Sequence, residues 1–257
     1  MSDIVDIYTN AIYDNLRPMY ANWQPGSPIE LGDYGFLDRK HFVHQGNVKD
    51  LGITFQPRND TSTDQINFSS KGNTKVTLNA AGSGPVGSGV TVKASLQVDF
   101  SSEEAVFFNA AECAYDMIQD KVALGTQIMD RFKKKTWNRD WVVVTDIVNA
   151  GATTIAISGS QSSSVVFQAS GSVPQINLAD ASIGLSVVAS SNVALQIAAQ
   201  KGMSPLIGLS KIQHAFLFFG NQFQPKLAMT SFPLPRLATT AEAGDPERNP
   251  AYFGQLK

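Results

Sequence analysis

The chain has 257 residues, and its 20 Lys and Arg side chains against 22 Asp and Glu side chains give a net charge of −2. This balance excludes the basic excess of a typical nucleic-acid-binding protein, so we expect no nucleic-acid partner. A hydrophobic share of 43% is ample for a core, and we expect a single domain over residues 1–240 with a polar tail at 241–257.

The first predicted elements are a helix and a strand pair. A helix over residues 3–16, ended by Arg17-Pro18, is predicted because apolar residues recur at spacings of three and four: Ile4, Tyr8, Ala11, Ile12 and Leu16. Its start has no basic segment followed by an apolar run, so we expect no secretory signal and a cytoplasmic, soluble chain. Residues 36–55 are predicted to form two short strands around a His-Gln-Gly-Asn turn at 44–47.

The most regular pattern lies between residues 66 and 100. Between 66 and 80 the apolar residues Ile66, Phe68, Val76, Leu78 and Ala80 all stand on even positions, and between 90 and 100 every even position is apolar, whereas polar side chains occupy the odd positions. This alternation predicts two long strands joined by a glycine-rich tip. Gly82, Gly84 and Gly87 in the tip match a dinucleotide-binding pattern, but that pattern needs a helix directly after it. We therefore interpret them as part of a hairpin tip.

A helical stretch is predicted over residues 102–135. Ser101 to Glu104 fit a capping box, and the apolar residues that follow keep helical spacing. Its end carries the main basic cluster of the sequence: Arg131, Lys133, Lys134, Lys135 and Arg139. One interpretation is a solvated helix end, where positive charge is favourable. The other is contact with lipid headgroups, to which each such residue contributes about 1 kcal/mol.

The remaining strands complete the predicted fold. Residues 141–148 are predicted to be a strand buried on both faces, and residues 153–198 alternate again, with Ile155, Ile157, Val165 and Phe167 among their apolar positions. Together the elements predict an α+β fold, in which a twisted antiparallel sheet with long amphipathic hairpins packs on the central helical stretch. We expect Val106, Phe107, Ile118 and residues 142–147 in the core.

Few residues are suited to catalysis or metal binding. The single cysteine, Cys113, excludes an internal disulfide, and three histidines make a closed zinc site hard to assemble. Cys113 lies among apolar residues, where a thiol behaves as a small hydrophobic side chain. No G-x-S-x-G, H-E-x-x-H, P-loop or EF-hand pattern is present. We therefore expect no enzymatic activity, no cofactor or metal, and no small-molecule substrate.

The order of elements resembles that of the pore-forming domain of gasdermins. The resemblance rests on the short first helix, the strand pair, the hairpin at 66–100, a helical stretch ending in FKKKTW, the apolar strand WVVVTDIV and the second alternating set at 153–198. It covers roughly residues 3–215, and it is to the pore-forming domain without the C-terminal inhibitory domain of many members.

The resemblance implies a soluble form that forms a homo-oligomer on membrane lipids and inserts hairpins as a β-barrel pore, which kills the cell. A membrane-spanning strand needs about 9–11 residues with alternate side chains facing lipid, which the hairpin at 66–100 supplies. The membrane-inserting residues would be Val76, Leu78, Val90, Val92, Leu96, Val98, Ile155, Ile157, Val165 and Phe167.

A second hypothesis stays open. Half-buried antiparallel sheets of soluble proteins alternate in the same way. The chain would then be a non-enzymatic structural or binding protein that assembles through its strands into a ring or tube.

Overall fold

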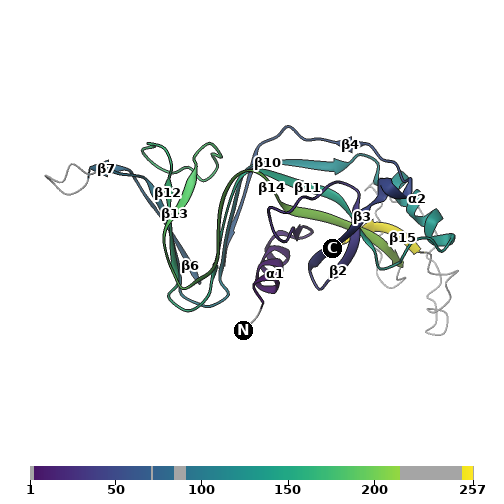
Figure 1. The fold of residues 1–257 in the computed structure, drawn as a ribbon, viewed down its shortest axis with the longest axis horizontal. Helices are drawn as coiled ribbons and strands as arrows, with labels where there is room; N and C mark the ends of the chain where they lie inside the picture. Colours follow the sequence, from purple (N-terminus) through teal and green to yellow (C-terminus); the bar gives the residue numbers. More distant parts are fainter. Residues whose placement is uncertain (1–2, 71, 84–90, 215–250, 257) are drawn as a thin grey trace, which may run out of the picture.

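The described residues form an antiparallel α+β fold, which confirms the predicted class. The computed structural model describes residues 3–70, 72–83, 91–214 and 251–256. Within these ranges every strand pair is antiparallel. Figure 1 shows an elongated molecule, with helix α2 (Lys121–Lys133) near one end and strand β7 (Gly82–Ser83) near the other.

A nine-stranded sheet forms the body of the molecule. Its longest path runs in the order β1 (Tyr20–Ala21), β14 (Val193–His214), β11 (Val142–Ser158), β10 (Val106–Ile118) and β4 (Pro57–Arg58). Attached to this path are β2 (Asp33–Asp38), β3 (His41–Asn47), β5 (Asp64–Ser69) and β15 (Ala251–Gln255). A short 3-10 helix, Val48–Leu51, follows β3.

A second sheet of four strands lies beyond the body. Its order is β13 (Leu185–Ser191), β12 (Ser164–Ala169), β9 (Ser95–Phe100) and β6 (Thr74–Asn79). A two-stranded sheet of β7 and β8 (Thr91–Val92) extends from it.

The two larger sheets are halves of one four-stranded ribbon. Each strand of the second sheet is joined by a short turn to a strand of the body: β6 to β5, β9 to β10, β12 to β11 and β13 to β14. Figure 1 shows these four strands leaving the body, running downward and then folding back upward. We call the part next to the body the proximal arm, and the sheet of β6, β9, β12 and β13 the distal arm.

Helix α1 (Ile4–Leu16) covers one face of the proximal arm. The Asp3 side chain caps its N-terminus by accepting a hydrogen bond from the amide of Val5. Tyr8 and Ile12, one turn apart, are fully buried in a cluster with residues of β10, β11 and β14. The prediction of this helix is confirmed, including its end at Arg17.

The acidic side of α1 faces the turn between β2 and β3. Arg39 bonds the Asp6 carboxylate, and the Lys40 ammonium lies 3.1 Å from the Asp14 carboxylate. The Lys40 hydrogen bond holds the pKa of Asp14 below its usual value. The basic partner of this acidic side is therefore within the chain itself.

The predicted core is confirmed. Val106, Phe107 and Ile118 are buried, as are Val142 and Ile147. A further cluster below α2 joins Leu124 and Ile128 of the helix to Trp137 and Val143.

The predicted helix over 102–135 is correct only for its second half. Residues 121–133 form α2, capped by the Asp120 side chain, but residues 106–118 form strand β10. Residues 106–111 are buried on both faces of the sheet. Without a solvent-facing side the sequence has no period of two, and its apolar residues also fit helical spacing.

Three local expectations also change. The turn of the first strand pair lies at Arg39 and Lys40, and the expected turn at 44–47 belongs to β3. The predicted long strand at 66–80 is divided into β5 and β6. Part of the expected C-terminal tail, Ala251–Gln255, is β15, which pairs with β14; the proposed boundary at residue 240 lies outside the described residues. In the described ranges no helix is long and apolar enough to cross a membrane.

Candidate functional site

All four strands of the ribbon bend at a residue with a left-handed backbone. These residues are Gly72, Glu104, Ser162 and Asn192, with φ of 75°, 60°, 63° and 55°. Left-handed conformations are uncommon for residues other than glycine and cost about 1–2 kcal/mol, although asparagine adopts them more easily than most residues. Four such residues at one level of the ribbon make the fold-back a defined feature of the structure.

Buried serines tie these bends together. The Ser163 hydroxyl donates to the Asn192 carbonyl at 2.6 Å, and the Ser158 hydroxyl donates to the Ser102 carbonyl at 2.7 Å. Both serines are 1% exposed, and they lie 3.2 Å apart, Oγ to Oγ. These bonds join three of the four bends, those at Glu104, Ser162 and Asn192, into one polar cluster. The sequence analysis missed these residues, because Ser-rich turns carry no signal for a fold-back.

The distal arm has one apolar face. Its side chains stand in cross-strand rows, one of which is Leu78, Leu96, Phe167 and Val187, and the next is Val76, Val98 and Val165. The inner strands β9 and β12 bury Leu96, Val98, Val165 and Phe167 completely. The edge positions Val76 and Leu78 are 38% and 39% exposed.

The proximal arm has an apolar face of its own, below α1. One cross-strand row consists of Phe68, Phe108, Ile155 and Ile197, with the Phe68 and Phe108 rings stacked at 5.5 Å. A second row pairs Val106 with Ile157 and Ile157 with Leu195.

The two apolar faces lie on opposite sides of the ribbon. In β10 the even-numbered Val106 and Phe108 face α1, whereas the odd-numbered Phe107 packs in the distal cluster. In β9 the even-numbered Leu96 and Val98 belong to that same distal cluster. The bend at Glu104 therefore shifts the alternation by one residue.

A straight strand would remove this shift. Because alternate residues of a strand share a face, Leu96, Val98, Val106 and Phe108 would then stand on one side. The other three strands also keep the same parity of apolar residues across their bends. The apolar positions are even in β5 and β6 and odd in β11 to β14: Ile66, Phe68, Val76 and Leu78; Ile155, Ile157, Val165 and Phe167; Leu185, Val187, Leu195 and Ile197. Straightening would thus give one continuous apolar face across the four strands.

The opposite face would be small and mostly polar. It would carry side chains such as Asn67, Thr77, Gln97, Thr154 and Gln168, with Phe107 as its largest apolar member. The straightened strands would therefore be amphipathic along most of their length, with the start of β10 as the exception.

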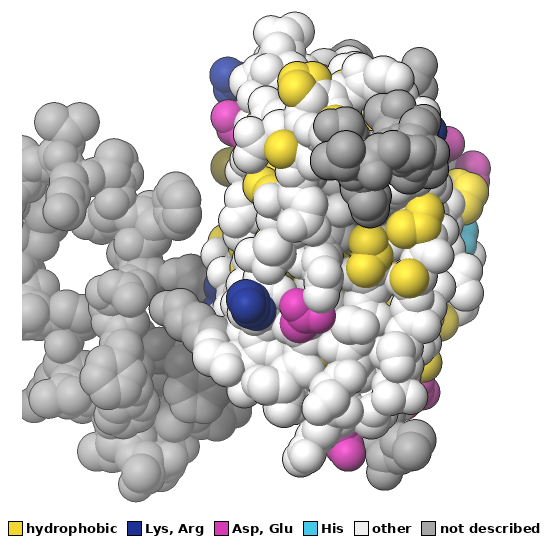
Figure 2. Space-filling view, turned by 90° about the vertical axis from the view of Figure 1, so that its left-hand side faces the viewer, with side chains coloured by type: hydrophobic (Ala, Val, Ile, Leu, Met, Phe, Trp, Pro, Cys, Tyr) yellow, Lys and Arg dark blue, Asp and Glu magenta, His cyan; other side chains and the backbone are white. Residues whose placement is uncertain are grey.

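The predicted membrane-inserting residues fall into three groups. Val76, Leu78 and Val92 are exposed, Leu96, Val98, Val165 and Phe167 are buried in the distal arm, and Ile155 and Ile157 are buried below α1. Val90 lies outside the described residues. Figure 2 looks at the distal end, where hydrophobic side chains gather among uncharged ones and only a few charged side chains are visible.

The predicted headgroup residues lie at the other end. Arg131 bonds the Leu51 carbonyl, and the Lys133 ammonium is 3.9 Å from the Asp130 carboxylate. Lys133, Lys134, Lys135 and Arg139 are exposed. Trp137, next to this basic cluster in sequence, is only 5% exposed and packs in a ring cluster with Tyr34 and Trp141.

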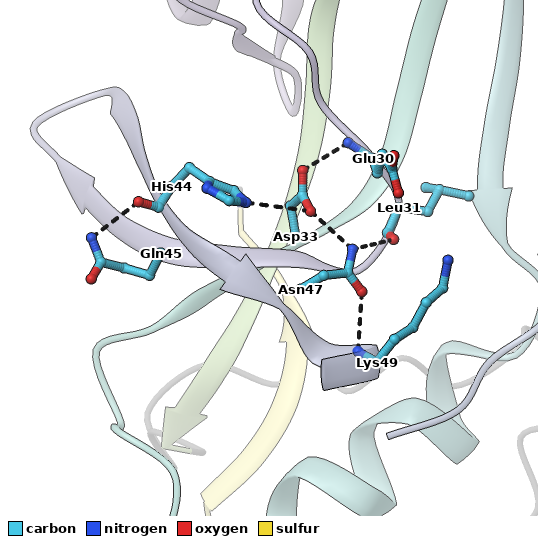
Figure 3. A network of polar contacts seen from close by, with 7 residues as sticks. All are labelled: Glu30, Leu31, Asp33, His44, Gln45, Asn47 and Lys49. Carbon is cyan, nitrogen blue, oxygen red and sulfur yellow. Dashed lines mark hydrogen bonds and ion pairs between the residues drawn. The ribbon is translucent and has the colours of Figure 1, made fainter. Parts of the chain in front are cut away.

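The polar contacts of the body are structural. The Asp33 carboxylate accepts bonds from the Glu30 amide at 2.8 Å and the Asn47 side chain at 2.9 Å, and His44 Nε2 lies 3.5 Å from it (Figure 3). These contacts fix the loops on either side of the β2–β3 hairpin. The described residues contain no group of three or more His, Cys, Asp or Glu side chains placed to hold a metal ion.

Cys113 is buried in the cluster below α1, and its thiol donates to the Ala110 carbonyl. Burial raises the pKa of this thiol to about 11, so it is protonated at neutral pH. A protonated, buried thiol is a poor nucleophile.

Comparison with protein families and with curated protein sequences found no match. The solved structures that match include the cryo-EM structure of the gasdermin A3 membrane pore, at a TM-score of 0.37 and 11% identity over 84% of this chain and 92% of that chain. This is the family that the order of elements resembles. A likeness at this level does not establish a common fold, so the function must follow from the residues of this chain.

Proposed function

We propose that this chain is a non-enzymatic pore-forming protein, in which the folded-back ribbon straightens and inserts its four strands into a membrane. The observation that carries the proposal is the parity of the apolar residues, which continues through all four bends although the folded structure does not use it. A strand in lipid needs alternate apolar side chains over about 9–11 residues. The segment from Asp64 to Ser83, straightened, exceeds that length.

Insertion requires oligomers. In lipid every backbone amide and carbonyl needs a partner, so a sheet in a membrane must close into a barrel. The four-stranded arm has two edges, β6 and β13, and these run antiparallel to each other because three antiparallel pairings separate them. The β13 edge of one copy would thus pair with the β6 edge of the next in a continuous antiparallel barrel.

The folded-back form is the soluble state in this proposal, and the barrel is the membrane-bound state that permeabilises the cell and kills it. The basic cluster at the end of α2 would contact lipid headgroups. Since α2 and the tip of the distal arm lie at opposite ends of the long axis (Figure 1), a molecule touching the membrane with both would first lie along its surface.

Leu78 and Thr77 provide a matched test of lipid exposure. They are neighbours on the edge strand β6 and point to opposite faces, and Leu78 is exposed enough for a charged replacement to reach water in the folded-back form. Leu96 is unsuitable for this test, because it is fully buried and a charged side chain there would destabilise the distal arm in the folded-back form itself.

We expect Leu78→Arg to abolish dye leakage from liposomes and Thr77→Arg to preserve it. An arginine facing lipid near mid-membrane costs about 2–4 kcal/mol, and the cost recurs in every subunit. Both variants gain the same charge, so their attraction to the liposome is equal. Equal leakage from both would contradict the proposal. Rings or tubes in electron micrographs of a wild type that causes no leakage would instead favour the structural assembly.

A further inference from the structure

The apolar face of the distal arm is covered by the segment that joins β12 to β13. We call residues 170–184 the strap. Its Ile176 is 3% exposed and belongs to the cluster of Leu96, Val98 and Phe167, and Val173, Leu178 and Ile183 pack against the same cluster. The strap thus gives the distal face the apolar cover that lipid would give it in a membrane.

The strap also bonds both arms of the fold. On the distal side, the Ala81 amide donates to the Pro174 carbonyl at 2.8 Å. On the proximal side, the Asn109 side chain of β10 donates to the Leu178 carbonyl at 3.0 Å. Asn109 is 3% exposed, and its side-chain oxygen accepts a hydrogen bond from Gln65 at 2.7 Å. This second bond fixes the orientation of the buried amide group that holds the strap.

A second contact on the proximal side fits closely. The Ala181 amide donates to the Glu112 carboxylate at 3.3 Å. At Gly151 of β11, an added Cβ would lie 2.8 Å from the Cβ of Ala181 and 3.1 Å from the Cβ of Glu112, so only glycine fits there without movement of the strap and a small adjustment at Glu112. Between the strap and strands β10 and β11 the remaining cavity is about 10 Å³, room for no more than one water.

We propose that the strap is a latch that keeps the ribbon folded, and that its release precedes insertion. The inference rests on the proposed function. Straightening carries the distal arm away from the proximal arm, so bonds from the strap to Ala81 and to Asn109 cannot both persist. Ile176 must also leave its cluster before that face can meet lipid. The latch is thus part of the second hairpin itself.

The composition of the strap suits its position after release. It would become the tip of the second hairpin, which has to cross the membrane. Asp180 is the single charged residue among residues 170–184. Ser182 donates its amide and hydroxyl to the Asp180 carboxylate at 2.8 and 2.6 Å, and the hydroxyl bond holds the pKa of Asp180 below its usual value.

A reversible cross-link tests the latch. Gly151→Cys with Ala181→Cys places two thiols where a shift of the strap by about 1 Å gives the usual Cβ–Cβ separation of a disulfide. We expect the oxidised protein to permeabilise liposomes at least about tenfold more slowly than the same protein after reduction, a factor that corresponds to about 1.4 kcal/mol. Equal rates before and after reduction, with the cross-link verified, would overturn the latch.

A loosened strap gives the opposite test and needs no cysteine. We expect Ile176→Ala to shift the strap at least about thirtyfold toward its released form, because loss of a buried isoleucine side chain commonly has an effect of this size. Hydrogen exchange at the Ala181 amide and liposome leakage should both accelerate. Ser182→Ala, which removes a bond within the strap only, is the control and should leave leakage near wild type.

The outcomes separate the two proposals. Faster exchange in Ile176→Ala with unchanged leakage would overturn the latch and leave the pore intact. If the double-cysteine variant causes no liposome leakage in either the oxidised or the reduced state, its result does not bear on the latch, and the leakage caused by Ile176→Ala tests the latch instead. A wild type that does not permeabilise liposomes would refute the proposed pore, and the latch with it.

Discussion

Replacing Gly72 with alanine isolates the energetic cost of the bend. Gly72 has φ of 75°, and an added Cβ would meet nothing within 4 Å. The substitution therefore causes no clash, and its whole effect is conformational. Alanine in a left-handed conformation costs about 1–2 kcal/mol, whereas in a straight strand alanine is favoured over glycine by about 0.5–1 kcal/mol.

The two effects act in the same direction. The folded-back form loses about 1–2 kcal/mol and the straight form gains about 0.5–1 kcal/mol, so the balance between them shifts by about 1.5–3 kcal/mol, or about 10- to 150-fold. The loss in the folded-back form alone should lower the melting temperature by about 2–8 °C, at about 2–4 °C for each kcal/mol in a chain of this size, and the shift in the balance should accelerate liposome leakage. Differential scanning calorimetry and dye release measure the two effects.

Two controls separate the bend from a general loss of stability. Gly171→Ala makes the same chemical change in open space and without a left-handed backbone, so it should not lower the melting temperature. Asp120→Ala removes the N-cap of α2, which accepts bonds from the Val122 and Ala123 amides, and should cost about 1 kcal/mol without faster leakage. A Gly72→Ala protein that melts as wild type or leaks no faster would refute the reasoning.

Further predictions concern the body of the molecule. Lys121→Ala should lower the free energy of unfolding in urea by about 1–2 kcal/mol, less than for a fully buried pair, because Asp146 loses an ammonium 2.6 Å away at a partly exposed site. Cys113 should resist iodoacetamide at pH 8, where a thiol of pKa about 11 is protonated, and react once the protein is denatured; rapid labelling of the native form would show that the site opens. Replacing the three lysines at 133–135 with alanine should weaken sedimentation with acidic liposomes at low salt and have little effect at high salt. Equal sedimentation of wild type and variant at both salt concentrations would identify the lysines as a solvated helix end.

Local patterns predicted the elements whose two sides differ in environment. The first helix was predictable because its apolar residues face the proximal arm and its acidic residues face the β2–β3 turn. Strand β10 was not, because a strand buried on both faces loses the period of two by which strands are recognised. The ion pair between Lys121 and Asp146 was not predictable for another reason. The two residues are distant in sequence, and only the packing of α2 on the sheet brings them together.

The sequence by itself determined the alternation of apolar residues over 66–80, 90–100 and 153–198, since that parity is a property of spacing alone. Only the tertiary structure decided that each strand folds back at a left-handed residue, which shifts the alternation and places the two apolar faces under different covers, α1 and the strap. The physical reason is that a backbone bend is local and small in energy, and its choice depends on contacts between distant segments, such as Asn109 with Leu178 and Ser163 with Asn192. Spacing along a chain carries no information about those contacts.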